Sequence, residues 1–288
     1  MNLAFVPQVL RRIRTDSPRV FLPYSLGRFA AIRRLYGGSL GMAQSVGAVP
    51  GLTPYSRSFF PGLDRARAAA ALKRDSVYVG LTLPRDAVER LLELADRNEC
   101  VHWRTFRRFH ASDVDARGRF SDGTPAILAD VADAELDPTV HALATDPAIL
   151  EVLELHLGYR PLQAQVRLLR SFLSDATDEE RRFVQQTIDY HFDVHSYSFG
   201  YLSFYLTDVD ADSGPHIMIR GSHDKKPLRW LFDSAIKPDD AIERYYGKDH
   251  VLMIAGHAGT GFLQDASCYH KALPPRARAR TMIQIRYY

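Results

Sequence analysis

A histidine and a carboxylate near residue 191 are the features of this 288-residue sequence that most directly suggest chemistry. His191 and Asp193 are separated by one residue, so on an extended strand both side chains point to the same face. A third imidazole from a distant strand would complete a set of two histidines and one carboxylate. That ligand set, with positions left open on the metal, is typical of non-heme Fe(II) oxygenases. We therefore predict a metal site at this pair.

Two histidines compete for the third position. His195 would share the strand face of the pair, but successive ligands on one straight strand are about 6–7 Å apart. Three such ligands could close around one ion only by straining the strand, so we favour His270, which arrives from further along the chain. The other histidines between residues 191 and 270 are expected to be hydrogen-bonded surface or core residues. They are His216, His223, His250 and His257.

A cationic run that follows His270 contains Arg276, Arg278 and Arg280. An iron oxygenase of this type commonly needs the dicarboxylate 2-oxoglutarate as co-substrate. A guanidinium suits its far carboxylate, because it donates two parallel hydrogen bonds. Arg280, at the start of the last predicted strand, is our candidate for this contact. A solvated turn is the expectation for Arg276 and Arg278, and it is the alternative for Arg280.

Composition and length limit the class of protein. With 46% hydrophobic and 25% charged residues, the chain resembles an ordinary soluble globular protein of one large domain or at most two. The net charge of +3 is too small to indicate a nucleic-acid partner. Two cysteines form no disulfide framework, and no apolar run is long enough to cross a membrane. We predict a cytoplasmic protein without stable membrane insertion, and its oligomeric state stays open.

Charge is concentrated near the N-terminus, where residues 1–36 hold seven arginines and one acid, Asp16. This segment is either a docking surface for an anionic substrate, carrier or membrane face, or a solvated amphipathic arm without a specific partner. We favour the second interpretation. Residues 37–63 are rich in Gly, Ser and Pro, and this composition predicts an extended loop that serves as a linker or a lid.

The remaining pattern is mainly helical first and mainly β later. A strand over 77–81, a helix from Pro84 and a helix over 140–157 are followed by a strand over 162–173. The capping-box pattern from Thr177 to Glu180 predicts a helix that runs to about residue 188. Further strands are predicted over 199–206, 217–219, 251–254, 261–264 and 281–288, with a helical insert over 228–246. This order predicts an α+β protein with a jelly roll or related double sheet.

Several motifs of the C-terminal third occur together in one known family. The stretches are His191-Phe192-Asp193, 205–210, Ser213-Gly214-Pro215-His216, Gly221-Ser222-His223, 259–265, His270 and Arg280. In their order and spacing, residues 190–288 resemble the phytanoyl-CoA dioxygenase (PhyH-like) family of Fe(II)/2-oxoglutarate-dependent oxygenases. Residues 77–94 and 137–158 resemble it more weakly, whereas residues 1–60 match nothing in the family.

The resemblance implies a double-stranded β-helix, which is a cupin-like jelly roll, with flanking N-terminal helices. It also implies that His191, Asp193 and His270 bind Fe(II), that Arg280 binds the C5 carboxylate of 2-oxoglutarate, and that O₂ is consumed. Related halogenases carry Gly or Ala at the position of Asp193, so the carboxylate favours hydroxylation or another oxidation. We divide the chain into an arm and loop (1–63) and one oxygenase domain (64–288), with the catalytic core over about 160–288.

Other residues are candidates for the pocket. Gln165 and Arg167 are proposed to hold the C1 side of 2-oxoglutarate, with Arg170 as a competitor, and Thr260 is a further co-substrate contact. Tyr197 and Ser198 are candidate substrate contacts. We predict a dioxygenase that hydroxylates or otherwise oxidises a small molecule in secondary-metabolite or glycan-related biosynthesis. The alternative is a cupin-like metal-binding protein or an isomerase that uses the same ligands without a co-substrate.

Overall fold

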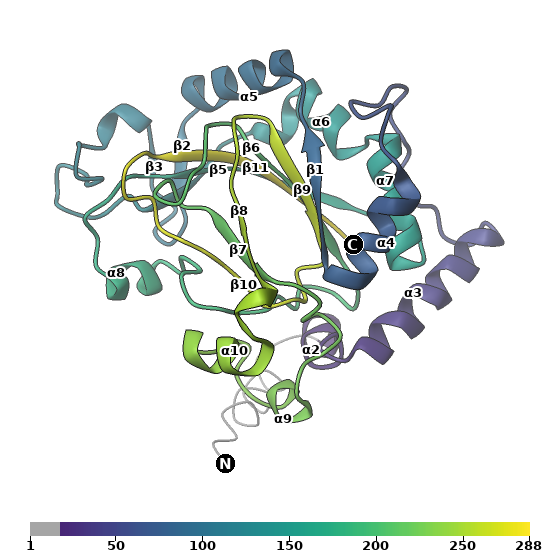
Figure 1. Cartoon of the computed structure of the whole chain (residues 1–288). Coiled ribbons are helices and arrows are strands. Elements are labelled where there is room, and N and C mark those ends of the chain that lie inside the picture. The colour runs from purple at the N-terminus through teal and green to yellow at the C-terminus, as the bar shows by residue number, and fades with distance from the viewer. Residues whose placement is uncertain (1–17) are drawn as a thin grey trace.

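Two antiparallel sheets form the centre of the molecule, a computed structural model of which we describe residues 18–288 (Figure 1). The larger sheet has the strand order β1-β9-β6-β11-β5-β4-β2-β3 and the smaller has the order β10-β7-β8. The strands of the larger sheet are β1 Val77–Thr82, β2 Cys100–His102, β3 Arg108–Phe109, β4 Leu128–Val131, β5 Ala164–Ser171, β6 Gly200–Tyr205, β9 Thr260–Gln264 and β11 Arg280–Tyr287. Those of the smaller are β7 His216–Ile219, β8 Val251–Ile254 and β10 His270–Ala272.

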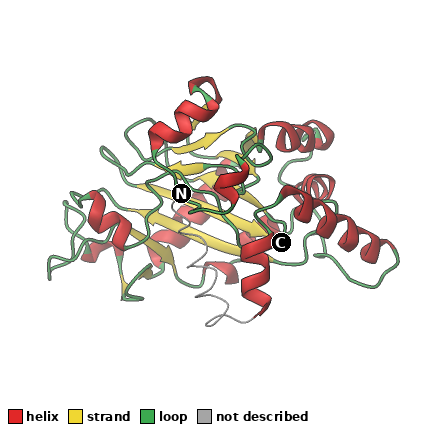
Figure 2. Cartoon of the chain, turned by 90° about the horizontal axis from the view of Figure 1, so that it is seen from below, coloured by secondary structure: helices red, strands yellow, loops and turns green. Residues whose placement is uncertain are grey.

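Helices surround the sheets, and several lie along the outer face of the larger sheet (Figures 1 and 2). They are α2 Pro18–Leu26, α3 Ala30–Ser45, α4 Arg65–Asp75, α5 Arg85–Arg97, α6 Pro138–Ala144, α7 Pro147–Leu157, α8 Asp178–Phe183, α9 Leu228–Leu231 and α10 Asp239–Tyr246. Single 3₁₀ turns occur at Ala111–Asp113, Ala134–Leu136 and Lys248–His250. Within residues 18–288, the structure contains no helix that combines the length and apolar character needed to cross a membrane.

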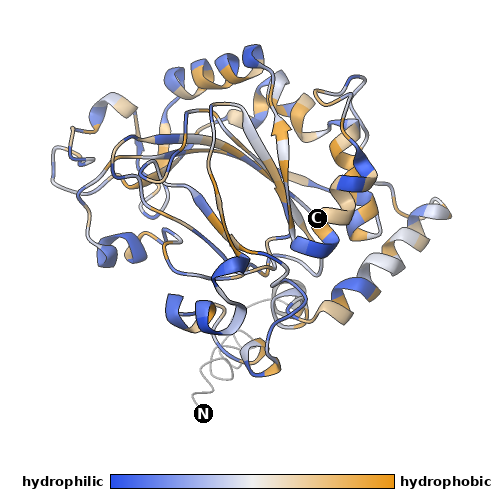
Figure 3. Cartoon of the chain, viewed as in Figure 1, coloured by the Kyte–Doolittle hydropathy of each residue, from blue (hydrophilic) through white to orange (hydrophobic). Residues whose placement is uncertain are grey.

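The larger sheet has an apolar cluster on each face, with polar residues beside the cluster on the inner face, and side-chain alternation along its strands separates the two clusters. On β11, Ile283 and Ile285 join the core formed with α4, α5, α6 and α7. Met282 points to the other face and packs with Met218 and Ile254 of the smaller sheet. The helix layer is accordingly amphipathic, as the alternating hydropathy of α5 shows (Figure 3). The larger sheet therefore forms one wall of the space between the two sheets, and the helices packed on its outer face hold that wall in place.

Most predicted strands are found at the expected places, but three helical segments differ. Asp146 and Pro147 divide the predicted helix over 140–157, because Asp146 accepts hydrogen bonds from the first amides of α7. Gly158 ends α7 in the left-handed conformation that glycine adopts readily. The helix after the Thr177 capping box ends at Phe183 instead of about residue 188, and the chain turns at Gln185 with φ of 62°. The insert over 228–246 contains two short helices, α9 and α10.

The prediction of an extended loop over 37–63 was wrong for its first part, because residues 37–45 belong to α3. The glycines there serve close packing. A Cβ atom at Gly37 would lie 2.1 Å from the carbonyl oxygen of Leu157, and one at Gly41 would lie 2.1 Å from that of Gly158. Four residues apart, the two glycines occupy one face of the helix. This face lets α3 approach the C-terminal end of α7.

The interpretation of the arginine-rich segment as a solvated arm was also wrong for two of its residues. Arg28 is buried and donates to the carbonyl oxygens of Leu231 and Asp233. Arg33 is buried and forms an ion pair with Asp224, with an N–O distance of 3.2 Å. These arginines connect the N-terminal helices to the segment after β7. Arg11, Arg12 and Arg14 lie outside the described residues.

The α3–α7 contact can be tested with a pair of neighbouring glycines. We expect Gly37→Ala to lower the free energy of unfolding by about 1–3 kcal/mol, because the added methyl group has no room beside Leu157. Gly38→Ala is the control: nothing lies within 4 Å of the position that its methyl group would take, so it should stabilise α3 by about 0.5–1 kcal/mol. Urea unfolding of both variants measures the difference. Equal midpoints would contradict the close approach.

Candidate metal centre

Paired backbone hydrogen bonds bring the two histidine segments together. The His191 amide donates to the His270 carbonyl oxygen at 3.0 Å, and the His270 amide donates to that of His191 at 2.8 Å. The Asp193 amide donates to the carbonyl oxygen of Ala266 at 2.9 Å. His191 and Asp193 are thus held in an extended segment that pairs with the chain around β10. The segment around His270, which is distant in the sequence, is therefore the direct neighbour of the segment around His191.

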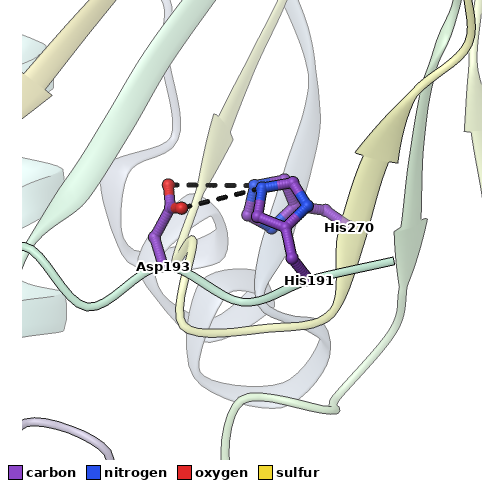
Figure 4. Close-up of side chains that lie close together, drawn as sticks. All are labelled: His191, Asp193 and His270. Carbon is purple, nitrogen blue, oxygen red and sulfur yellow. Dashed lines mark ion pairs between the residues drawn. The ribbon is translucent and has the colours of Figure 1, made fainter. Parts of the chain in front are cut away.

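His191, Asp193 and His270 form the cluster of potential metal ligands that the described residues contain, with ligand atoms all within 4.8 Å of one another. The Nε2 atom of His191 lies 3.7 Å from Asp193 Oδ1, and that of His270 lies 3.8 Å from Asp193 Oδ2. Figure 4 shows both imidazoles directed toward the carboxylate. Three donors converge on one point, and this geometry suits a single metal ion.

Backbone contacts set the ring orientation of both histidines. The Nδ1 atom of His191 lies 3.0 Å from the carbonyl oxygen of Asp189, and that of His270 lies 3.0 Å from the carbonyl oxygen of Cys268. A carbonyl oxygen can only accept a hydrogen bond, so Nδ1 carries the proton in each ring. In this tautomer the nitrogen available to bind a metal is Nε2, the atom that faces Asp193 in both residues. Metal-binding histidines are commonly oriented in this way.

The protonation states of the cluster also suit a cation. Burial opposes ionisation of Asp193, but His195, His270 and His191 outweigh it and hold the pKa of this carboxyl well below its usual range. Burial, followed by the neighbouring His191, lowers the pKa of His270 to about 4. At neutral pH the cluster therefore has an ionised carboxylate and an uncharged His270. Both are the forms that bind metal.

The hydroxyl group of Tyr201, on β6, donates to Asp193 Oδ2 at 3.0 Å. Tyr201 is buried, so its ring cannot easily leave this position. Asp193 is thereby attached to the larger sheet by its side chain and to the Ala266 carbonyl by its backbone. Fixing a carboxylate by a second contact is how outer-shell residues orient a metal ligand.

A cavity of about 380 Å³ extends from the cluster between the two sheets. Arg280 lies in its wall, buried, and donates to the Gly214 carbonyl oxygen and to Ser171 Oγ. Among the described residues, no carboxylate pairs with this guanidinium, and its Nε atom has no hydrogen-bond partner. An arginine in such surroundings can bind an anionic ligand. The sequence-predicted ligands and the predicted anchor thus share one cavity.

The other predicted pocket residues divide into two groups. Gln165 and Arg167 line the cavity, and Arg167 forms two hydrogen bonds with Asp130, of 2.9 and 2.8 Å. Thr260, Tyr197 and Ser198 are not part of its lining.

The position of each residue in the second group has a local cause. Thr260 pairs with Thr82 at the edge between β9 and β1. The ring of Tyr197 packs on Tyr36 of α3, with ring centres 4.9 Å apart. The carbonyl oxygen of Ser198 accepts from Tyr159 on the outer side. After His195 the chain turns away from the metal cluster, so sequence proximity misplaced Tyr197 and Ser198.

His195, the rival ligand, lies at the edge of the same cavity. Its Nε2 atom is 3.5 Å from Asp193 Oδ2, but its side chain is 43% exposed, against 6% for His270. It does not belong to the group whose ligand atoms all converge. The geometry therefore favours His270 as the third ligand, and His195 lies where a molecule entering the cavity would meet it.

Sequence reasoning missed His216, which was assigned no role in the pocket. Its ring is buried and stacks on His270 with ring centres 5.3 Å apart, and its Nε2 atom has no partner among the described residues. Burial, with His270 and Arg280 nearby, places the pKa of His216 well below the usual range for histidine. The sequence feature that could have indicated His216 is its position at the end of the Ser213–His216 motif. Tyr201 gave no comparable signal, because it lies within an aromatic strand.

Comparison with known proteins gives a fold but no close relative. No protein-family model matches the chain, and no curated protein matches it. Among solved structures, the non-heme alpha ketoglutarate dependent epimerase SnoN from nogalamycin biosynthesis has a TM-score of 0.54 and 20% sequence identity. The match covers 77% of this chain and 82% of SnoN.

Two further structures carry ligands. EctD from S. alaskensis with 2-oxoglutarate and 5-hydroxyectoine has a TM-score of 0.51 and 19% identity, with 83% of this chain and 82% of EctD covered. SnoN in complex with Fe3+, alpha ketoglutarate and nogalamycin RO has a TM-score of 0.50 and 19% identity, with 77% and 82% covered. The chain shares its fold with these non-heme enzymes. At such low identity the likeness supports the fold alone.

The contact between Tyr201 and Asp193 predicts an effect on metal affinity. We expect Tyr201→Phe to weaken Fe(II) or Mn(II) binding about 10–100-fold, because the carboxylate loses the group that orients it. Tyr205→Phe is the matched control: Tyr205 is a buried tyrosine of the same strand, but its hydroxyl group contacts the Ile254 carbonyl and the His216 amide. Metal titration followed by calorimetry measures the affinity of both variants. Their melting temperatures show whether a loss of affinity comes from a loss of stability instead of a loss of carboxylate orientation. Unchanged affinity in Tyr201→Phe would contradict the role.

Proposed function

We propose that this chain is an Fe(II)/2-oxoglutarate-dependent dioxygenase of the PhyH-like kind, built on a double-stranded β-helix, that hydroxylates or otherwise oxidises a small molecule. One observation carries the proposal. Arg280 is buried and has no carboxylate partner among the described residues. It lines the same cavity as the cluster of His191, Asp193 and His270. Metal binding alone would require the cluster but not the arginine.

The donor set fits Fe(II). Two imidazole nitrogens and one carboxylate are the ligands used by non-heme iron oxygenases, and they leave further positions for co-substrate and O₂. His191, Asp193 and His270 would hold the metal through the atoms that already converge. Their backbone hydrogen bonds and the Tyr201 contact restrict the ligands before the metal arrives, so little reorganisation is needed.

The other end of the cavity fits 2-oxoglutarate. Arg280 would bind its C5 carboxylate, with Ser171 Oγ beside the guanidinium. The next position inward on β11 is Met282, paired with Leu169 of β5, and both line the cavity. An apolar pair beside a cationic end matches a molecule whose carboxylate is followed by two methylene groups.

When bound at Fe(II), O₂ would be the oxidant and 2-oxoglutarate would be oxidised to succinate and CO₂ together with the substrate, while the protein supplies position. His191, Asp193 and His270 orient the metal, and Arg280 orients the co-substrate at the far end. The apolar cluster around Phe262 packs beside the cavity and would limit the access of water from that side. The volume of about 380 Å³ suits small molecules rather than polymers.

The domain division and the biological setting are also proposals. We propose that residues 64–288 form the oxygenase domain, with its catalytic core over about 160–288. The helix α3 packs on this part through Gly37 and Gly41 and adds to its support. Secondary-metabolite or glycan-related biosynthesis is the setting that we propose.

The proposal predicts that the full chain with Fe(II) consumes 2-oxoglutarate and forms succinate. Arg280→Met should weaken 2-oxoglutarate binding at least about tenfold, because two charge-assisted hydrogen bonds are lost. Arg278→Gln is the matched control, since Arg278 lies two residues earlier, is exposed and pairs with Asp210. Calorimetry with Mn(II)-loaded protein measures affinity, and succinate assay measures turnover.

The outcomes separate the two function classes. If the chain binds Fe(II) but not 2-oxoglutarate, it is a cupin-like metal-binding protein or an isomerase and the proposal is wrong. If Arg280→Met binds 2-oxoglutarate as tightly as the wild type, the proposed anchor is wrong. A folded Arg280→Met variant that binds Mn(II) normally shows that the metal site is independent of the arginine.

A further inference from the structure

We propose that the substrate carries an oxyanion, a carboxylate or a phosphate, and that Arg286 binds it. This inference rests on the proposed function, because it takes the metal and 2-oxoglutarate to occupy the places described above. It depends on a second arginine of β11 that also lines the cavity.

One face of β11 forms the wall of the cavity along most of the strand. Arg280, Met282, Gln284 and Arg286 alternate with the buried core residues and all line the cavity. Six residues separate the two arginines, so their backbone positions are about 20 Å apart along a strand. This separation exceeds the length of one carboxylate group many times, so the C5 carboxylate held by Arg280 is not the anion that Arg286 would bind. Arg286 needs another anionic group at the metal end of the wall.

Arg286 lies beside the metal cluster. In the sheet it pairs directly with Tyr201 of β6, and directly opposed residues have Cβ atoms about 4.5–5.5 Å apart. The hydroxyl group of Tyr201 contacts Asp193 at 3.0 Å. Arg286 thus neighbours the residue that touches a proposed metal ligand, at the end of the wall away from Arg280. A molecule held there would lie near the metal, as a substrate must.

No carboxylate pairs with Arg286 among the described residues. Its guanidinium donates to Gln165 Oε1 and lies 5.7 Å from the ring of Tyr288, and its Nε atom is buried without a partner. Arg167, by contrast, has Asp130 as its counter-ion. The buried Nε atom of Arg286 therefore offers a donor that nothing in the described residues uses, and an anionic ligand would supply both the acceptor and the missing counter-charge.

Charge balance leads to the same conclusion. The carboxylate that lines the cavity is that of Asp193. Asp193 and the C1 carboxylate of 2-oxoglutarate would balance Fe(II), while its C5 carboxylate would balance Arg280. Asp130 already balances Arg167. Arg286 is the charge of this wall that remains, and an anionic substrate would neutralise it.

Gln165 completes the subsite. It is the direct cross-strand partner of Arg286 on β5, so its amide lies beside the guanidinium. We predicted this residue to hold the C1 side of 2-oxoglutarate. Its position in the row of Arg286 and Tyr201, away from Arg280 and Ser171, puts it at the metal end of the wall, where we propose that it also contacts the substrate. An amide and a guanidinium together provide several donors for the oxygens of a carboxylate or phosphate.

The test uses the full chain loaded with Mn(II) and saturating 2-oxoglutarate, without O₂. The probes are phenylacetate, phenyl phosphate and the neutral phenylacetamide, and calorimetry measures their dissociation constants. We expect at least one acid to bind about tenfold or more tightly than the amide. Arg286→Gln should remove this preference while leaving 2-oxoglutarate affinity unchanged. Arg286→Lys should keep part of it, and Arg278→Gln should keep all of it.

A preference for phenylacetate identifies a carboxylate as the recognised group, and a preference for phenyl phosphate identifies a phosphate. Absence of any acid preference in the wild type, including no binding of any probe, would overturn the proposal. So would a preference that survives in Arg286→Gln. If Arg286→Gln does not fold, the wild-type preference and its partial retention in Arg286→Lys decide the question. Failure of 2-oxoglutarate to bind while the acid preference depends on Arg286 would instead count against the proposed function alone.

Discussion

The pair of backbone hydrogen bonds between His191 and His270 is the interaction on which the candidate site depends. It joins the segment after α8 to β10 and brings the two imidazole rings to a distance of 4.3 Å between centres. Because β10 also pairs with β7, the bridge ties the ligands to the smaller sheet. Asp193 then faces the larger sheet, where Tyr201 receives it. The candidate metal centre thus lies where side chains connect the two sheets.

Strand β11 lies in the wall of the cavity opposite the smaller sheet, and its two faces lie in different environments. Its odd-numbered residues Ile283 and Ile285 pack under the helices, and the burial of such side chains is worth about 1.5–3 kcal/mol each. Because burial of this apolar face fixes the register of β11 against its neighbouring strands, the even-numbered residues cannot shift along the sheet. The positions of Arg280 and Arg286 therefore depend on aliphatic residues that never contact a ligand.

The sequence predicted which candidate ligands lie together better than it predicted their surroundings. The His191–Asp193 spacing and the distant His270 were enough to identify a convergent cluster, because ligand types and alternation are local properties. Tyr197 and Ser198 could not be placed, since the turn after His195 depends on the packing of Tyr197 against Tyr36 of α3. Helix α3 itself was hidden because glycine usually disfavours helices, and at Gly37 its value comes from a contact with Leu157.

Electrostatics explains why such a cluster can exist before a metal binds. A buried carboxylate is costly unless hydrogen bonds or positive charges stabilise it, and Asp193 is contacted by Tyr201 and His195. Its pKa therefore lies well below the usual range, and the carboxylate stays ionised at neutral pH. His270 stays neutral there because burial lowers its pKa to about 4. The cluster thus keeps one negative charge in a cavity lined by three arginines, of which Asp130 pairs with one, and the positive charge that remains favours the entry of anions.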